Sequence, residues 1–199
     1  PHTATAINTK VTRCFMLYAD DEWEVEEQPG WVTLSRTSGK GRTQMQLTFS
    51  RMPSGTVRDG KVVFRLKGQD YRVTMDVHQY DYAHEEDEII ELQKAAKGRG
   101  VNVVLLGDGY DAKDISEGKL LADMNETMED FFAIEPYRTY RDYFNVYTSI
   151  AVSPESGVGN VNTVVDNRFG TSARRGVLAG ASDEILEYAC RMPSVDRDN

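Results

Sequence analysis

The chain has 199 residues, of which 40% are hydrophobic, 28% charged and 10% aromatic, and its formal net charge is −9. This length suggests one or two domains, and the aromatic content is sufficient for packed cores, which excludes a disordered chain. No apolar run approaches the roughly 20 residues of a membrane-spanning helix, so we expect no transmembrane segment. The acidic composition argues against a nucleic-acid-binding protein, which would normally present a basic face.

The chain contains two cysteines, Cys14 and Cys190, and three histidines, His2, His78 and His84. Two cysteines exclude a disulfide-dense scaffold and a four-cysteine zinc site. We expect two separate buried thiols, because free cysteine behaves as a small hydrophobe, although a bridge between them stays open. No signal-peptide pattern is present, and a chain that starts with proline is compatible with a processed N-terminus.

The charge divides the chain into two parts. Residues 1–82 carry 11 Lys and Arg against 10 Asp and Glu, whereas residues 83–199 carry 12 against 22. The change coincides with the acidic run at 85–88, which we interpret as the solvated surface of a linker. We therefore predict a domain boundary at residue 82, with one domain at 1–82 and a second at 83–199.

The first part is predicted to form short strands and glycine turns. Residues 23–26 and 31–35 have strand composition, 38–41 is predicted as a turn, and Met45, Leu47 and Phe49 alternate with polar residues. Residues 62–66 and 71–77 flank a short polar segment, which predicts a hairpin. Together these elements indicate an all-β immunoglobulin-like sandwich.

The order of these features resembles a known module. Trp23 on a strand, Trp31-Val32, Gly39-x-Gly41, Arg58-x-Gly60 and a terminal Gln79 follow one another between residues 7 and 80. This series is similar to the BACON module, an immunoglobulin-like domain common at the N-terminus of secreted Bacteroidetes proteins. The resemblance implies carbohydrate binding, but a packing role for both tryptophans is the simpler reading, since glycan binding requires exposed aromatic faces. We therefore favour a spacer domain.

The second part changes from strands alone to an α/β pattern. Residues 101–106 form a continuous apolar run, as expected of a strand covered on both faces, and 144–152 are predicted as a second strand. Between them, residues 114–132 have helical periodicity, with Asp114 as the expected N-cap and Pro136 as a stop. Strand, crossover helix and strand indicate a parallel α/β layer. Residues 88–96 fit a helix or a strand.

Five ordered motifs in this part resemble a second family. They are Leu105-Leu106-Gly107-Asp108-Gly109-Tyr110, Phe131-Phe132-x-x-Glu135-Pro136-Tyr137, Tyr140-Arg141-x-x-Phe144-Asn145-Val146-Tyr147, Ser153-Pro154-Glu155-Ser156-Gly157 and Arg168-Phe169-Gly170-Thr171. The series is similar to the amino-terminal portion of the IgA-protease-type zinc metallopeptidases of Bacteroidetes. The resemblance implies a partial zincin-like α/β domain, hydrolysis of peptide bonds in a protein or peptide substrate, zinc in the complete enzyme, and a secreted, periplasmic or cell-surface location.

The zinc-binding motif of such peptidases is missing from this sequence. A zincin places His-Glu-x-x-His on one helix, so that two imidazoles bind zinc and the glutamate acts on the metal-bound water. His84-Glu85 is followed by Glu86, Asp87 and Glu88, and no Gly-x-Ser-x-Gly motif is present. We therefore expect no catalytic residue, no metal ligand and no cofactor in this chain, which would be the N-terminal portion of a longer enzyme.

The candidate site residues lie in two turns of the second part. We expect Asp108, Gly109, Tyr110, Ser153, Glu155 and Gly157 to line a cleft or to support it, since ligand sites of α/β sheets lie at strand ends. Asp108, Asp111 and Asp114 could together suggest a calcium site. In the simpler reading, Asp108 makes hydrogen bonds within its turn, Asp111 faces solvent and Asp114 caps a helix. The alternative function is a non-catalytic surface protein whose sandwich binds glycan or protein.

Overall fold

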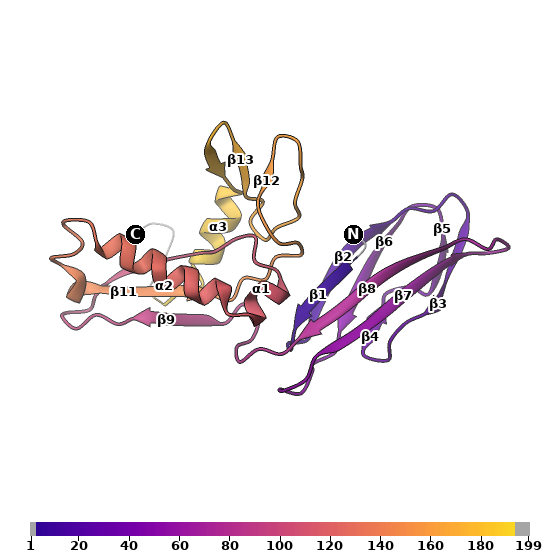
Figure 1. Ribbon diagram of the computed structural model, residues 1–199, viewed down its shortest axis with the longest axis horizontal. Coiled ribbons are helices and arrows are strands. Elements are labelled where there is room, and N and C mark those ends of the chain that lie inside the picture. The colour runs from indigo at the N-terminus through magenta and orange to yellow at the C-terminus, as the bar shows by residue number, and fades with distance from the viewer. Residues whose placement is uncertain (1–2, 194–199) are drawn as a thin grey trace. The chain divides into compact units, whose positions relative to one another are not determined.

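The computed structural model describes residues 3–193, and the chain is rich in β-strand with a few helices. Its contacts divide it into two compact units, residues 1–83 and residues 84–199, here called unit 1 and unit 2 (Figure 1). His2 lies outside the described residues. No helix within residues 3–193 is both long and apolar enough to cross a membrane.

Unit 1 consists of two β-sheets. The larger has the strand order β1-β8-β7-β3-β5 and the smaller the order β2-β6-β4. All neighbouring strands are antiparallel except β1 and β8, which run parallel. The bounds are β1 Thr3–Ile7, β2 Val11–Leu17, β3 Glu22–Glu27, β4 Val32–Leu34, β5 Ser38–Lys40, β6 Thr43–Phe49, β7 Arg58–Leu66 and β8 Arg72–Tyr80.

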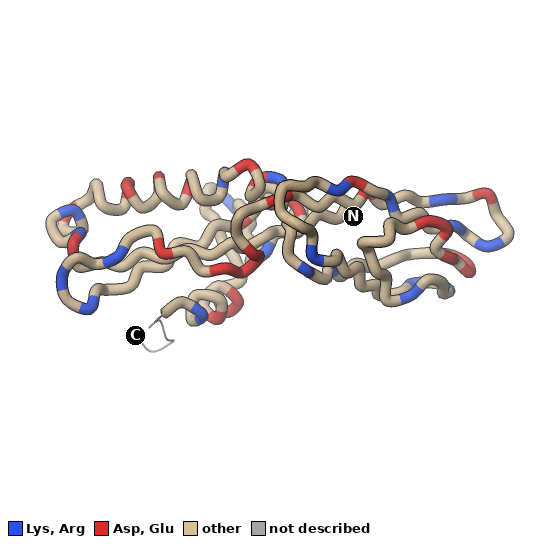
Figure 2. The backbone as a smooth tube through the Cα atoms, turned by 90° about the horizontal axis from the view of Figure 1, so that it is seen from below, with Lys and Arg blue, Asp and Glu red and all other residues tan. Residues whose placement is uncertain are grey.

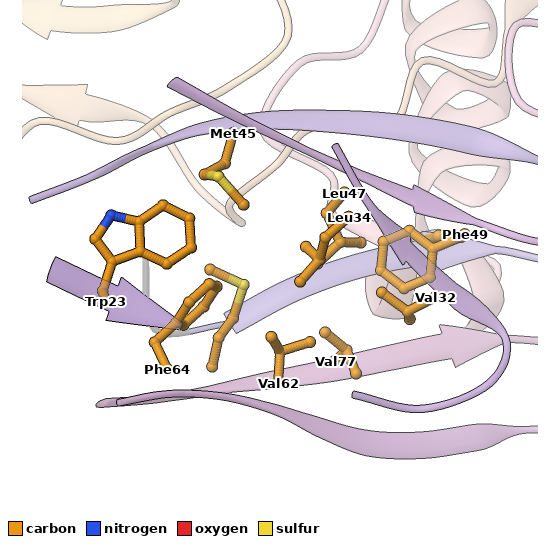
Figure 3. Packing of buried hydrophobic residues seen from close by; sticks show 11 residues of the cluster. Trp23, Val32, Leu34, Met45, Leu47, Phe49, Val62, Phe64 and Val77 are labelled. Carbon is orange, nitrogen blue, oxygen red and sulfur yellow. The ribbon is translucent and has the colours of Figure 1, made fainter. Parts of the chain in front are cut away.

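The core of unit 1 contains buried residues from both sheets. Trp23 is 1% exposed and meets Phe64 edge to face, with 6.0 Å between the ring centroids. Met45, Leu47 and Phe49 are fully buried, as their alternation along β6 predicts (Figure 3). The buried amide of Gln79 donates to the carbonyls of Ile7 (3.1 Å) and Ser50 (3.0 Å), which ties β8 to its neighbours.

Two predictions for unit 1 are wrong. Residues 38–40 form strand β5 rather than a turn. Position 39 is glycine for a packing reason, because a Cβ there would lie 2.7 Å from the Trp23 ring. Only Gly41 has the positive φ, +67°, of a turn glycine. The expected burial of Cys14 also fails, because this residue lies at an outward position of β2 and is exposed. Both cysteines are free, and Cys190 is partly buried.

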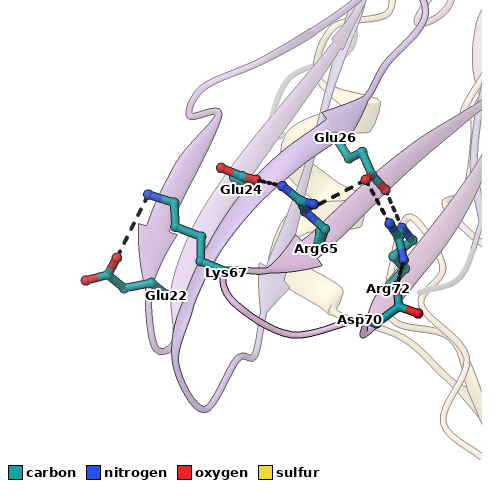
Figure 4. A network of polar contacts seen from close by, with 7 residues as sticks. All are labelled: Glu22, Glu24, Glu26, Arg65, Lys67, Asp70 and Arg72. Atoms are coloured by element: carbon teal, nitrogen blue, oxygen red, sulfur yellow. Dashed lines mark hydrogen bonds and ion pairs between the residues drawn. The ribbon is translucent and has the colours of Figure 1, made fainter.

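An ion-pair network covers the outer face of β3, β7 and β8 (Figure 4). Arg65 bonds Glu24 and lies 3.7 Å from Glu26, and Arg72 bonds Glu26 at 2.5 Å. Because these side chains are partly exposed to solvent, the network contributes little to stability and mainly fixes the side chains across the strands.

Unit 2 is built on a three-stranded sheet with the order β10-β11-β9. β10 and β11 are parallel, as predicted from the strand, helix, strand order, and β9 pairs antiparallel with β11. A second small sheet has the order β12-β13-β14. The bounds are β9 Ile89–Gln93, β10 Val101–Val104, α1 Ala112–Ser116, α2 Lys119–Phe132, the 3₁₀ turn Arg141–Tyr143, β11 Phe144–Ser149, β12 Gly159–Asn160, β13 Ser172–Arg174, β14 Val177–Ala179 and α3 Ser182–Ala189.

Helices cover both faces of the β10-β11-β9 sheet. On one face Met128 and Phe132 of α2 pack with Val146, and on the other Tyr188 of α3 packs with Tyr147. The apolar run at 101–106 therefore divides between two clusters: its residues 103 and 105 belong to the α2 side, 104 and 106 to the α3 side. The solvent side of α2 is acidic (Figure 2), with exposed carboxylates at Asp123, Glu126, Glu129 and Asp130.

The predicted helix at 114–132 starts earlier and is interrupted. The side chain of Asp111 accepts from the Asp114 amide at 2.9 Å, so the N-cap is Asp111 and the prediction of Asp114 is wrong. Gly118, with φ +79°, then separates α1 from α2. The helix α2 ends at Phe132, before Pro136, and the ambiguous segment at 88–96 contains strand β9.

The acidic run at 85–88 is partly solvated, as predicted, with Glu85 and Asp87 exposed, but it is bonded into unit 2 and is not a linker. The Asp87 amide donates to the carbonyl of Ile150 (2.9 Å), and the Ile150 amide donates to that of Glu88 (3.0 Å). The Asp87 carboxylate accepts from the hydroxyl of Tyr188 at 2.6 Å. This run therefore belongs to the packed structure of unit 2.

Candidate functional site

The candidate site lies where the chain leaves the first parallel strand of unit 2. The Leu105 amide donates to the carbonyl of Tyr147 (2.9 Å), so strand-like pairing continues past β10. Gly107 is closely packed, since a Cβ there would lie 2.5 Å from Leu120. The chain then turns at Asp108, at the carboxyl end of the strand, which is where the sequence predicts it.

Asp108 accepts four hydrogen bonds from three segments. Its Oδ1 accepts from the Gly109 amide (2.9 Å) and the Ser153 hydroxyl (3.1 Å). Its Oδ2 accepts from the amides of Phe169 (3.2 Å) and Thr171 (3.1 Å). Both oxygens are thus engaged by the chain itself, and this carboxylate acts as a crosslink between distant loops.

Ser153 is fully buried at the centre of the same group. While donating to Asp108, its Oγ accepts from the amides of Gly109 (3.0 Å) and Arg168 (3.1 Å). Its own amide donates to the carbonyl of Tyr110 at 2.8 Å. Every hydrogen-bonding position of this hydroxyl is used, so the serine holds the turns together rather than presenting a nucleophile.

Gly109 and Gly157 bring the backbones of their two loops into contact. The Gly157 amide donates to the carbonyl of Gly109 at 2.7 Å. Gly109 has φ +78°, and a Cβ on it would lie 2.4 Å from the carbonyl oxygen of Gly157. Glycine at 109 is therefore required both by the left-handed backbone and by the space available.

Tyr110 and Glu155 extend the group outward. The Tyr110 hydroxyl donates to Asp123 on α2 at 2.6 Å, and its pKa is raised to about 12 by burial and by this carboxylate. Glu155 is exposed; its carboxylate accepts from the Asp166 amide (2.9 Å) and its own amide donates back to the Asp166 carbonyl (2.9 Å). All six sequence-predicted residues thus lie on the connected turns at 108–110 and 153–157.

The segment at 167–171 completes this arrangement and was not predicted as part of it. Asn167 is buried and donates to the carbonyls of Gly157 (3.3 Å) and Thr171 (2.8 Å). The partners of Asp108 and Ser153 in this segment are backbone amides, which leave no side-chain signature in a sequence. The only available signal was the Arg168-Phe169-Gly170-Thr171 motif. We call residues 108–110, 153–157 and 167–171 the Asp108 cluster.

Asp111 and Asp114 also have defined partners. Asp111 caps α1, and Asp114 bonds Lys119 (2.6 Å) and the hydroxyl of Ser156 (2.5 Å). Burial raises the pKa of Asp114, but the bonds from Lys119 and Ser156 outweigh it and the net pKa is lowered. The three aspartates thus serve a turn, a cap and an ion pair.

A second polar group surrounds Tyr188. Its hydroxyl contacts Ser149 (3.0 Å) and donates to Asp87, whose backbone has φ +66°. Burial raises the pKa of Tyr188, and the bond to Asp87 adds to this. The guanidinium groups of Arg168 and Arg191 lie 5.4 and 4.5 Å from the ring. A tyrosine held protonated in this way anchors α3 to the sheet.

The described histidines do not form a metal site. His78 bonds Asp59 at 2.6 Å in unit 1, and His84 bonds Glu88 at 3.0 Å in unit 2. Within residues 3–193, no group of three or more His, Cys, Asp or Glu side chains is arranged to hold a metal ion. These residues therefore do not fit a catalytic zinc ion.

Comparison with known proteins supports a peptidase family. The sequence model of the IgA Peptidase M64 family matches residues 90–173, a segment that contains the whole Asp108 cluster and less than half of the chain. This match supports the metallopeptidase family for that segment. A search of curated proteins gave no match.

One solved structure similar to this chain is "Bacteroides ovatus GH5 xyloglucanase in complex with a XXXG heptasaccharide". The alignment has 16% identity and a TM-score of 0.40, and it covers 43% of this chain. It spans 18% of the xyloglucanase chain.

Proposed function

We propose that this chain is the N-terminal portion of a secreted zinc-dependent metallopeptidase that hydrolyses peptide bonds in proteins or peptides. In this proposal residues 1–82 are a BACON-like module that acts as a spacer, and residues 83–199 are the first α/β part of the peptidase domain. A His-Glu-x-x-His helix, which this sequence lacks, would come from further sequence and would supply the zinc that activates water.

The observation that carries the proposal is the family match over residues 90–173. The matched segment coincides with the two parallel strands and with the turns that Asp108 and Ser153 connect. Ligand sites of α/β sheets lie at the carboxyl ends of strands, so turns fixed there are suited to form the wall of a substrate cleft. The role we assign to the chain's own residues is therefore to shape and rigidify that wall.

The Asp108 cluster gives this role a physical basis. The Asp108 carboxylate and the Ser153 hydroxyl are held by bonds within the cluster, so neither is placed to bind zinc or to take a proton from water. Rigid turns reduce the entropy lost when an extended substrate binds. We accordingly assign to Asp108, Gly109, Tyr110, Ser153, Glu155 and Gly157 a supporting role in the cleft and no catalytic role.

The mass of the intact native protein tests the proposal most directly. We expect a chain longer than 199 residues that contains His-Glu-x-x-His, hydrolyses a protein substrate, and loses that activity when zinc is chelated. The 199-residue chain alone should show no peptidase activity. A native protein that ends at Asn199, or a longer one without chelator-sensitive activity, would contradict the proposal and favour a non-catalytic surface protein.

A further inference from the structure

A polar hollow of about 530 Å³ lies on unit 1, far in sequence from the Asp108 cluster. No carboxylate contributes to its walls, although the chain as a whole has a net charge of −9. The residues that line it are Ser35, Arg36, Lys40, Arg42, Thr43, Gln44 and Gln46.

The hollow forms where the chain crosses from one sheet to the other. β4 pairs with β6 as far as Leu34, and Ser35 adds two bonds: its amide donates to the Gln46 carbonyl (2.9 Å), and its Oγ accepts from the Gln46 amide (3.0 Å). The chain then leaves β6 to form β5 in the larger sheet. Backbone groups two residues apart point to the same edge of a strand. The backbone amide of Gln44 therefore points to the same edge of β6 as that of Gln46, beyond the end of β4.

Three cations surround this opening. Arg36, Lys40 and Arg42 are all exposed, and no described residue forms an ion pair with Arg36. The guanidinium of Arg42 lies 5.3 Å from the ring centre of Tyr18, which holds it beside the hollow. These three side chains come from the β4–β5 connection, from β5 and from the β5–β6 turn, so the fold gathers them from separate positions.

The acidic groups nearby leave most of this positive charge uncompensated. Lys40 lies 3.9 Å from Asp21, with both side chains more than half exposed, so this pair is weak. Glu22 stands opposite Lys40 in the strand register but pairs with Lys67 at 3.9 Å. Neither carboxylate lines the hollow.

From this arrangement we propose that the hollow binds a tetrahedral oxyanion, namely a phosphate or sulfate group. Guanidinium groups match such oxygens with two parallel N–H bonds, and an ammonium group adds a point charge. The side-chain amides of Gln44 and Gln46 and the hydroxyl of Ser35 supply neutral donors. The Ser35 oxygen already accepts a bond from the Gln46 backbone amide, so its hydrogen is left to donate. The site is independent of any peptidase activity.

The test is an NMR titration of the ¹⁵N-labelled 199-residue chain with sodium phosphate or sodium sulfate, with sodium chloride keeping the ionic strength constant. We expect saturable amide shifts confined to residues 35–46. Arg36→Ala should weaken binding about tenfold, since one charge-assisted contact is lost. Arg36→Lys, which keeps the charge but loses the planar fork, should give an intermediate affinity. Arg36 is exposed, so the spectra of both variants should otherwise match the parent.

Lys10→Ala is the matched control, because it removes one exposed positive charge from the same unit away from the hollow. Its affinity should equal that of the parent. Equal weakening by Lys10→Ala and Arg36→Ala, or shifts that never saturate, would overturn the proposal. Methyl phosphate and methyl sulfate identify the source: binding equal to that of the inorganic ions supports a free anion, and tighter binding supports a group carried on a larger molecule.

Discussion

The interiors of the two units are of different kinds. In unit 1 one cluster of 11 buried apolar residues joins both sheets (Figure 3). In unit 2 the apolar residues form smaller clusters on either face of the sheet, and Asn145, Thr148, Ser149, Ser153 and Asn167 are buried as well. Apolar burial is non-directional, whereas a buried polar group needs a partner in a defined place. Unit 1 also buries the bonded amide of Gln79, but its interior rests mainly on packing, whereas that of unit 2 rests more on particular hydrogen bonds.

The largest expected effect is on the core of unit 1. Trp23→Ala should lower the free energy of unfolding of unit 1 by about 4 kcal/mol, because a large buried side chain leaves a cavity. Urea titrations followed by residue-resolved NMR would report each unit separately, and unit 2 should be unaffected. Trp31→Ala is the control: Trp31 is only partly buried, so the loss should be clearly smaller. Equal losses would contradict the central role of Trp23.

Asp108→Leu is the corresponding test for unit 2. It should destabilise unit 2 by about 3 kcal/mol, since the amides of Phe169 and Thr171 and the hydroxyl of Ser153 lose their acceptor. Asp108→Asn keeps the shape and one acceptor oxygen, so about 1 kcal/mol should be lost. The same urea titration measures both variants. Parental stability in Asp108→Leu would show that the cluster is not what holds unit 2 together.

Alanine substitutions at Gly109 and Gly118 distinguish the cost of backbone strain from the cost of a steric collision. Gly109 and Gly118 have nearly the same φ, +78° and +79°, but only at Gly109 would a Cβ meet another loop. Gly118→Ala should cost about 1 kcal/mol of unfolding free energy through strain alone, and Gly109→Ala about 2 kcal/mol through strain plus the collision. If thermal unfolding gives equal losses, the approach to Gly157 has no energetic weight.

The smallest expected effect concerns the ion-pair network on unit 1. The hydrogen bond from Arg72 lowers the pKa of Glu26 below its ordinary value of 4.5. A carboxyl group with a lowered pKa in the folded state stabilises it above pH 4.5, and this contribution disappears as the pH falls toward the folded-state pKa. In urea unfolding between pH 6 and pH 3, Arg72→Gln should flatten the pH dependence of unit 1 slightly. An unchanged dependence would mean that the pair is fully screened.

Prediction from sequence succeeded where a pattern records a local physical requirement. The alternation of Met45, Leu47 and Phe49 predicts a half-buried strand, and the apolar run at 101–106 predicts the parallel strand next to β11. Strand β5 was missed because Gly39 leaves room for the ring of Trp23, and in a sequence such a packing glycine cannot be distinguished from a turn glycine. The cap of α1 was misplaced by three residues because Asp111 and Asp114 have the same capping chemistry.

The candidate site was predictable in part. Asp108 and Ser153 lie at the ends of two parallel strands, and such ends meet at one edge of a sheet, so their proximity could be expected. The amides of Phe169 and Thr171, which complete the set of Asp108 bonds, come from a loop more than 60 residues away in sequence. No residue type marks a backbone amide, so this part required the structure.

The pairing of β1 with β8 has a mechanical consequence. These strands are parallel, with Thr3 opposite Asp76 and Ile7 opposite Tyr80, so the start of the first strand and the end of the last lie at opposite ends of one ladder. A force that pulls the two ends of unit 1 apart would load this ladder along its strands. Its hydrogen bonds would then resist together in shear rather than open one at a time. A domain with this geometry is suited to carry tension between the segments that it joins.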